Sequence, residues 1–286
     1  MPKIGDLYKQ QYELCKPFGV LSADLRILIA HNEGFEQQID VIYHKEDEMK
    51  HPSVFLSQCE RLRKGEPVEY IINESQFLGK NLYVDKNVLI PRNETEELVS
   101  YLSQKVSSYF DPRNYLMVGD IGTGSGAIIL GVKSLFPNWV CAASDIKREA
   151  LKVAKKNFDR YSIQVDTRLG DALDPWIKDN TKFDILISNP PYILHKEDAQ
   201  QSVIDYEPDS ALWLTKENDV YEKIFRDVYK VKREALLLAF EISPDLVNHL
   251  NQLMEKYLHD YECEFIKDLS GFDRFLFVYL KDEEND

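Results

Sequence analysis

The chain has 286 residues, of which 44% are hydrophobic and 29% charged, and its formal net charge is −14. That length allows one large and one small domain whose cores need no metal or disulfide. The acidic balance argues against broad phosphate-driven binding of nucleic acid, which needs a basic surface. Charged residues interrupt the first twenty positions, and no stretch reaches the roughly 18 apolar residues of a membrane span. We therefore expect a cytoplasmic protein that binds neither membrane nor nucleic acid directly.

Cysteine and histidine spacing indicates no metal site. The six histidines form no HExxH pattern, and the cysteines are too far apart in sequence for paired metal ligands. Free thiols are therefore expected at Cys15, Cys59, Cys141 and Cys263.

Residues 1–75 are predicted to form a small helical domain, because apolar residues recur there at three- and four-residue spacing. Pro52 suits the first turn of a helix, and the Gly-Glu-Pro sequence at 65–67 is a stop signal. The apolar positions of the two patterns are Leu21, Leu25, Leu28, Ile29, Val54, Phe55, Cys59 and Leu62.

Short β-prone runs between 77 and 90 are broken by turn residues, which predicts a β-hairpin linker at 76–90. A larger domain at 91–286 would then open with a helix beginning around Thr95. Glu96 and Glu97 lie near the positive end of that helix, where acidic side chains are favoured.

Strands and helices alternate in the larger domain, a pattern typical of an α/β fold with a mostly parallel sheet and helices on both faces. Ligands of such sheets bind at the carboxyl ends of the strands. Two closing runs are too close for a crossover helix and should pair antiparallel. The predicted strands are 116–120, 140–145, 163–169, 183–188, 236–242, 264–268 and 274–280, with helices at 126–136, 148–158 and after Pro244.

A glycine-rich loop lies between the first strand and its helix. Its sequence runs Asp120-Ile121-Gly122-Thr123-Gly124-Ser125-Gly126. A dinucleotide pyrophosphate would favour GxGxxG, with amide donors aimed at phosphates. Here the glycines run as GxGxG after an aspartate. Such a carboxylate suits a cationic ligand, such as the amino acid end of S-adenosylmethionine. A tight turn without ligand is the alternative.

Two further acidic residues follow the next strands. Asp145 closes the second strand, where its carboxylate can accept both hydroxyls of a ribose. The alternative is an N-cap for the helix starting at Arg148. Asp171 and Ala172, after the third strand, are the natural place for contacts to adenine.

The most informative stretch follows a buried strand run and reads Asn189-Pro190-Pro191-Tyr192. The lone pair of an amide or exocyclic amine is delocalised and must be freed before it attacks a methyl sulfonium. The side-chain carbonyl of Asn189 and the backbone carbonyl of Pro190 can accept the two N–H protons of such a nitrogen. Consecutive prolines hold that carbonyl rigidly and present no competing donor, and Tyr192 offers a flat stacking face. A stiff turn after a strand is the alternative.

With these motifs, the sequence resembles the bacterial release-factor glutamine methyltransferases, also called the HemK-like family, over nearly its whole length. Further matches are Gly-Glu-Pro-Val-Glu-Tyr-Ile at 65–71, Val-Leu-Ile-Pro-Arg-Asn-Glu-Thr-Glu at 88–96 and Tyr-Glu-Pro-Asp-Ser-Ala-Leu at 206–212. Asn-Pro-Pro-Tyr alone is shared with adenine-N6 DNA and RNA methyltransferases, whereas the Ile-Pro-Arg-x-Glu-Thr-Glu stretch at 90–96, together with the preceding helical domain, is much more selective.

The resemblance implies a Rossmann-like class I methyltransferase domain with a mostly parallel seven-stranded sheet. It implies methyl transfer from S-adenosyl-L-methionine, leaving S-adenosyl-L-homocysteine, to the side-chain nitrogen (N5) of the glutamine in the Gly-Gly-Gln motif of peptide-chain release factors. The helical domain would help to grip this partner in translation termination, with the enzyme acting as a monomer. The cofactor residues implied are Gly122, Thr123, Gly124, Ser125, Gly126, Asp145, Ala172 and Asn189, and the catalytic ones are Asn189, Pro190, Pro191 and Tyr192. Asp171 joins the expected cofactor residues by its position after the third strand.

Some positions depart from the family pattern. Asn73 stands where glycine is usual, Ala172 where a bulky side chain is common, and Asn218 in a segment that lacks the usual Asp-Gly-Leu. Arg92 and Thr95 are expected to border the cofactor, although a helix-start role for Thr95 is the alternative.

Other functions stay open at this point. The alternatives within enzymes are a glutamine methyltransferase acting on a ribosomal protein and an adenine-N6 nucleic-acid methyltransferase. A catalytically silent binding module is an alternative of another class. The acidic balance disfavours the nucleic-acid enzyme, and the intact Asn189 disfavours the silent module.

Overall fold

The computed structural model describes residues 1–281, so the last five residues of the expected larger domain lie outside it. The chain forms two compact units. The first unit is Met1–Glu74 together with Gln200–Tyr206, and the second is Ser75–Ala199 together with the chain from Glu207 on.

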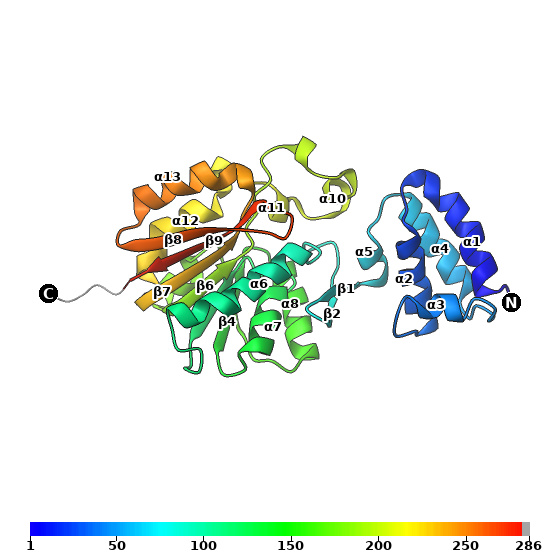
Figure 1. Cartoon of the computed structure of the whole chain (residues 1–286), viewed down its shortest axis with the longest axis horizontal. Helices are drawn as coiled ribbons and strands as arrows, with labels where there is room; N and C mark the ends of the chain where they lie inside the picture. Colours follow the sequence, from blue (N-terminus) through cyan, green and yellow to red (C-terminus); the bar gives the residue numbers. More distant parts are fainter. Residues whose placement is uncertain (282–286) are drawn as a thin grey trace. The chain divides into compact units, whose positions relative to one another are not determined.

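The first unit is helical. Its elements are α1 (Ile4–Cys15), η1 (Lys16–Phe18), α2 (Ser22–Glu33), α3 (Asp40–Tyr43), α4 (Pro52–Arg63), α5 (Val68–Ile72) and α10 (Gln201–Tyr206) (Figure 1). As predicted, Pro52 lies in the first turn of α4. α5 ends at Asn73, whose φ of 56° is left-handed. Asparagine tolerates this conformation better than most residues, which explains how it replaces the usual glycine.

Six of the eight apolar positions predicted for this core are buried. Leu21 and Val54 are exceptions, with exposed fractions of 65% and 46%. Leu21 precedes α2, where its N–H donates to Asp24 Oδ2 at 2.8 Å, so it lies outside the repeating face. The prediction was therefore wrong for these two residues.

The predicted hairpin forms earlier in the chain than expected, with β1 at Glu74–Phe77 and β2 at Lys80–Tyr83. Leu78 and Gly79 make the turn, both with positive φ. No strand follows between residues 84 and 92, where the sequence predicted one. Asp85 Oδ1 instead accepts the Asn87 N–H at 3.0 Å in a tight turn.

The second unit contains a seven-stranded sheet in the order β5-β4-β3-β6-β7-β9-β8. β9 pairs antiparallel with β7 and β8, as expected for the closing runs, and the other pairings are parallel. The strands are β3 (Met117–Ile121), β4 (Val140–Asp145), β5 (Asp166–Leu169), β6 (Phe183–Ser188), β7 (Lys232–Glu241), β8 (Tyr261–Lys267) and β9 (Asp273–Leu280).

Helices cover both faces of this sheet (Figure 1). One face packs on α6 (Asn93–Lys105), α7 (Ala127–Leu135) and α8 (Arg148–Arg160), and the other on α9 (Asp174–Lys178), α12 (Val220–Asp227) and α13 (Val247–Tyr257). The remaining elements are α11 (Asp209–Leu212), η2 (Val106–Ser108), η3 (Lys196–Asp198), η4 (Lys216–Asn218), η5 (Val228–Lys230) and η6 (Pro244–Leu246).

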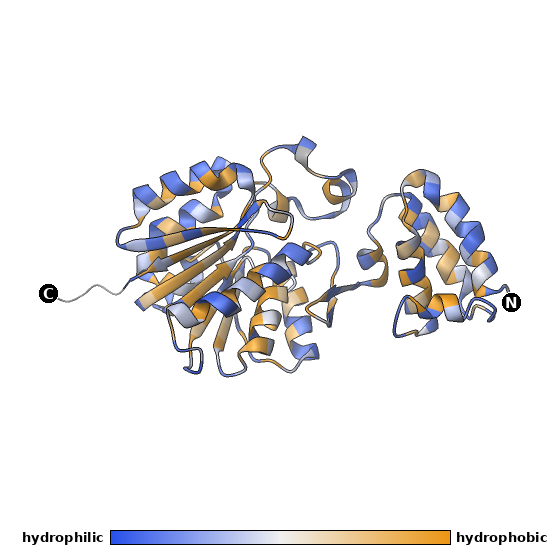
Figure 2. Ribbon diagram, viewed as in Figure 1, coloured by the Kyte–Doolittle hydropathy of each residue, from blue (hydrophilic) through white to orange (hydrophobic). Residues whose placement is uncertain are grey.

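Burial on both faces explains why the central strands read as unbroken apolar runs. Along β7, Leu237 and Ala239 face one layer of helices, while Leu236, Leu238 and Phe240 face the other. Figure 2 shows these strands as a hydrophobic interior between more polar helix surfaces.

The α/β class and mostly parallel sheet are confirmed, and β4 and β6 have the predicted bounds. The predicted elements differ mainly at their ends: α6 begins at Asn93 rather than Thr95, and β5 begins at Asp166 rather than 163. The sequence did not predict α9 and α12, which cover one face of the sheet. β5 is an edge strand paired only with β4, so its pairing sets its length. None of the helices in residues 1–281 combines the length and apolarity that crossing a bilayer demands.

Leu238 offers a test of the core. It is fully buried in β7, between Leu186 and Val278 on the neighbouring strands. Leu238→Ala should lower the free energy of unfolding by about 2–5 kcal/mol, because it leaves a cavity. The control is Leu269→Ala, at an 88% exposed position, which should change it by less than about 0.5 kcal/mol. Equal effects in urea denaturation would contradict the packing described.

Candidate active site

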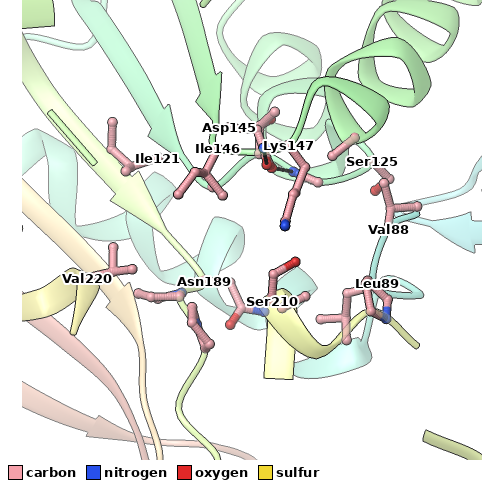
Figure 3. Close-up of a pocket in the computed structure, with 18 of the residues that line it drawn as sticks. Val88, Leu89, Ile121, Ser125, Asp145, Ile146, Lys147, Asn189, Ser210 and Val220 are labelled. Carbon is pink, nitrogen blue, oxygen red and sulfur yellow. Dashed lines mark hydrogen bonds between the residues drawn. The ribbon is translucent and has the colours of Figure 1, made fainter. Parts of the chain in front are cut away.

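A pocket lies where β3, β4 and β6 end, at the point where the strand order reverses. Open α/β sheets bind ligands at such a switch point. In Figure 3, Asp145 and Lys147 project into the pocket from one side, and Asn189 and Ser210 from the other. Expected site residues on its wall are Gly122, Thr123, Gly124, Ser125, Asp145, Asp171, Ala172, Asn189, Pro190 and Pro191.

The glycine-rich loop is held by backbone donors. Thr123 N donates to Ser144 O at 2.9 Å, and Gly124 N donates to Asp145 Oδ2 at 3.0 Å. A side chain on Gly124 would meet no atom within 4 Å, but its φ of +53° is one that other residues rarely adopt. The loop therefore leaves open space toward the pocket.

Gly126 is not among the lining residues, although we expected it to bind the cofactor. It packs behind the loop, where an added Cβ would lie 2.6 Å from Phe158 Cε1. Its φ is +82°. Gly126 thus allows α8 to approach the loop closely.

Asp120 is fully buried beneath the same loop. Its Oδ2 accepts the Thr123 hydroxyl at 2.7 Å, while its Oδ1 has no hydrogen-bond partner among the described residues. Burial raises the pKa of Asp120 to about 7. An unpaired buried acceptor beside a pocket is costly unless a ligand or water compensates it.

Asp145 is 8% exposed and lines the pocket. Its two oxygens accept the N–H groups of Gly124 and Lys147, at 3.0 and 2.8 Å. Burial raises the pKa of this carboxyl. The N-cap of α8 is Lys147, so the alternative role of Asp145 as the cap of that helix is wrong.

Asp171 and Ala172 lie together on the pocket wall after β5. Lys223 Nζ forms an ion pair with Asp171 Oδ2 at 2.6 Å, which holds that carboxylate from α12. Ala172 has a left-handed φ of 44°. Asn218, another departure from the family pattern, also lines the pocket.

Three of the four residues of the tetrapeptide at 189–192 line the pocket, and Tyr192 does not. The Tyr192 ring packs against the core on the α12 face of the sheet, and its hydroxyl donates to Glu241 Oε1 at 3.1 Å. Burial raises the pKa of Tyr192 well above its usual range. In this structure Tyr192 supports the tetrapeptide from behind.

Glu241, at the end of β7, was missed by sequence reasoning. It is fully buried, and burial raises its pKa to about 7. Thr95 Oγ1 donates to Glu241 Oε2 at 2.7 Å, and Asn189 Nδ2 donates to Thr95 Oγ1 at 3.1 Å. The one available signal is an acidic residue closing an apolar strand. Thr95 lines the pocket and caps no helix, so its helix-start role is wrong.

A second pair of motifs meets at the pocket wall. Arg92 is not a lining residue, contrary to expectation, and it forms an ion pair with the buried Glu207. Glu207 Oε2 also accepts the Ile90 N–H at 3.4 Å. This joins the stretch at 88–96 to the stretch at 206–212, and Leu89, Pro91, Pro208 and Ser210 line the pocket.

Metal ligands do not gather anywhere in the described part of the chain: residues 1–281 contain no group of three side chains arranged to hold an ion. All four cysteines are free thiols, and Cys15, Cys59 and Cys141 are buried.

Comparisons with known proteins agree with the fold. Residues 95–208 match the family model described as the methyltransferase small domain. The structure is similar to the 16S rRNA N2 G1207 methyltransferase of T. thermophilus, solved in complex with AdoMet and guanosine. That likeness has a TM-score of 0.52 and 14% identity, covering 73% of this chain and 50% of the other. It shows the shared fold alone. Relatives 37% and 32% identical over most of the chain are methyltransferases, so this chain belongs to that class of enzyme.

The sequence comparisons narrow this class. The release factor glutamine methyltransferase of Bacillus subtilis (strain 168) is 37% identical, over 77% of each chain. That of Staphylococcus aureus (strain NCTC 8325 / PS 47) is 32% identical, over 88% of this chain and 95% of the other. The chain therefore belongs to the release factor glutamine methyltransferase family.

The close packing at Gly126 gives a prediction. Gly126→Ala should destabilise the protein by about 1–3 kcal/mol beyond Gly271→Ala, because it adds overpacking against Phe158 to the cost of positive φ. Gly271 is the matched control, with φ +87° and nothing within 4 Å of an added Cβ. Thermal and urea unfolding measure the difference, and equal losses would refute the proposed close approach.

Proposed function

We propose that this chain transfers a methyl group from S-adenosylmethionine to the side-chain nitrogen (N5) of the glutamine in the Gly-Gly-Gln motif of peptide-chain release factors. One observation carries the proposal: Asn189 and the two prolines after it share a pocket with the glycine-rich loop and Asp145. Membership of the family supports the substrate.

The pocket suits S-adenosylmethionine by its chemistry. The open backbone at Gly122 and Gly124 leaves room for the amino acid end of the cofactor, and the buried Asp120 supplies negative potential beneath it. Asp145 lines the pocket and would accept hydroxyls of the ribose, and Asp171 with Ala172, which also line it, would border the adenine. Once bound, the cofactor supplies a methyl group already activated by its sulfonium.

Asn189 and Pro190 would bind the glutamine side chain. The Oδ1 of Asn189 and the carbonyl of Pro190 accept its two N–H protons, which draws the nitrogen toward tetrahedral geometry and directs its lone pair to the methyl group. Neither acceptor titrates near neutral pH. The residues therefore accelerate transfer by orientation and charge complementarity rather than by acting as a base.

We assign recognition of the release factor to the helical part of the chain, within the proposed domains of 1–75, a 76–90 linker and 91–286. The enzyme would act as a monomer in the cytoplasm. No basic surface is required for this partner, which is consistent with a net charge of −14.

The function is tested by incubating the protein with methyl-labelled S-adenosylmethionine and an intact release factor. Label should appear on the glutamine of the Gly-Gly-Gln motif, located by tandem mass spectrometry, and should vanish when that glutamine is replaced by alanine. Adenine-containing DNA and ribosomal proteins are offered in parallel. Label on either of them, with none on the release factor, would overturn the substrate assignment.

Asn189 gives a separate prediction. Asn189→Ala should lower turnover by roughly 10²–10³-fold, because one of two preorganised acceptors is lost. Cofactor affinity, measured by calorimetry, should change much less than turnover. Turnover near that of the wild type would refute the acceptor role.

A further inference from the structure

Both ends of the tetrapeptide at 189–192 are held by the same buried carboxylate. Tyr192 donates its hydroxyl directly to Glu241 Oε1 at 3.1 Å. Asn189 reaches the other oxygen, Oε2, through the hydroxyl of Thr95, in steps of 3.1 and 2.7 Å. Glu241 and Thr95 are 0% and 4% exposed.

The ionisation of Glu241 fixes the donor and the acceptor in each hydrogen bond of this series. An ionised carboxylate only accepts hydrogen bonds, so the Thr95 hydroxyl must donate its single proton to Glu241. The Thr95 oxygen can then only accept, and Asn189 must turn its N–H toward it. The Oδ1 atom of Asn189 is left for the pocket, on the side where a substrate N–H would arrive.

We propose that Glu241 is the positioning residue of the reaction, which acts through Thr95 and Tyr192 to hold the Asn189 amide in its acceptor orientation. This inference rests on the proposed function, because it concerns the acceptor that meets the glutamine. Glu241 itself does not line the pocket, so it would act through Thr95 and Tyr192 rather than by contact with a ligand.

Protonation of Glu241 would remove its preference for one orientation of the Asn189 amide. A neutral carboxyl carries a proton that it can donate to Thr95, and Thr95 could then donate to Asn189 in turn. The amide would be free to flip and present its N–H groups to the substrate nitrogen, where they oppose binding. The ionised carboxylate therefore selects one of two amide orientations.

Groups from α6, α12, β9 and the loop after β6 face Glu241. Its own backbone carbonyl accepts the Tyr221 hydroxyl from α12 at 2.7 Å. Arg274 on β9 favours the ionised form, whereas burial and Glu94 on α6 oppose it. Arg274 is also paired with Asp268, at 3.1 Å, so its charge is shared.

Paired variants test the proposal. Glu241→Gln keeps the shape and loses the charge, and Thr95→Val loses the hydroxyl that Thr95→Ser retains. We expect kcat for release factor methylation to fall about 10- to 100-fold in Glu241→Gln and Thr95→Val, with recovery in Thr95→Ser. The variant that combines Glu241→Gln with Thr95→Val should have a kcat little below that of the slower single variant, because both changes break the same series of hydrogen bonds.

Asp184→Asn is the matched control. Asp184 is also a buried acid in the second unit, but it lies at the start of β6, where it accepts the Met117 N–H at 2.6 Å. Its replacement should leave kcat and the pH profile as in the wild type. Thermal unfolding of every variant separates loss of fold from loss of orientation, and the Thr95 pair supplies the answer if Glu241→Gln does not fold.

A pH profile gives a readout that a purely structural role would not change. Because burial raises the pKa of Glu241 to about 7, wild-type kcat should fall as pH drops through that region and the carboxylate becomes protonated. Glu241→Gln should be slow at every pH and lack this acid limb. An acid limb that persists in Glu241→Gln with unchanged midpoint and depth belongs wholly to another group, such as Asp120, and would overturn the proposal.

The orientation is also visible without turnover. In protein labelled with ¹⁵N-asparagine, the Asn189 side-chain signals, assigned with Asn189→Ala, should shift with pH in the wild type and not in Glu241→Gln. Wild-type kcat in Glu241→Gln, or equal losses in Thr95→Val and Thr95→Ser, would also overturn the role of Glu241. Such results leave the proposed function intact, which fails only if wild-type enzyme does not methylate the release factor.

Discussion

Parallel pairing of β3 with β4 on one side and with β6 on the other is the constraint on which the site depends. The pairing aligns Ile121 with Ser144 and Asp120 with Ile187, so all three strands end at the same edge. The loops that follow these strands therefore lie together at that edge. Residues as far apart in sequence as Ile121 and Pro191 thereby line one pocket.

Two buried acidic residues lie at the same edge, and the stability of the fold does not require them. Asp120 and Glu241 are both fully buried, and burial raises the pKa of each to about 7. Desolvating a carboxylate costs free energy that partners only partly return. Glu241 has Thr95 and Tyr192 as donors, whereas Asp120 keeps one oxygen unpartnered among the described residues. Both of these buried carboxyls lie beside the pocket, where a role in function rather than in stability explains their burial.

Local patterns predicted the parts of the molecule that local physics decides. The strands at 140–145 and 183–188 are apolar runs buried on both faces, and their bounds followed from the sequence. The first helical pattern was less informative, since Leu21 fits the spacing but precedes its helix. The hairpin began earlier than predicted because the positive-φ turn lies at Leu78 and Gly79.

Contacts between distant residues could not be predicted in this way. Thr95 and Glu241 are separated by 146 positions, and Arg92 and Glu207 by 115, so no spacing rule connects them. Tyr192 read as a stacking face from sequence, yet its hydroxyl is held by Glu241. The direction of the Tyr192 side chain depends on Glu241 of the neighbouring strand β7, and only the assembled fold brings these two residues together.

A crystal structure with S-adenosylhomocysteine and a Gly-Gly-Gln peptide would show whether Asn189 and Pro190 accept the two N–H groups of the glutamine. The glutamine nitrogen should lie within hydrogen-bond distance of Asn189 Oδ1 and the Pro190 carbonyl, while Asn189 Nδ2 still donates to Thr95. A glutamine bound with its oxygen facing Asn189, or an Asn189 side chain released from Thr95, would contradict this geometry.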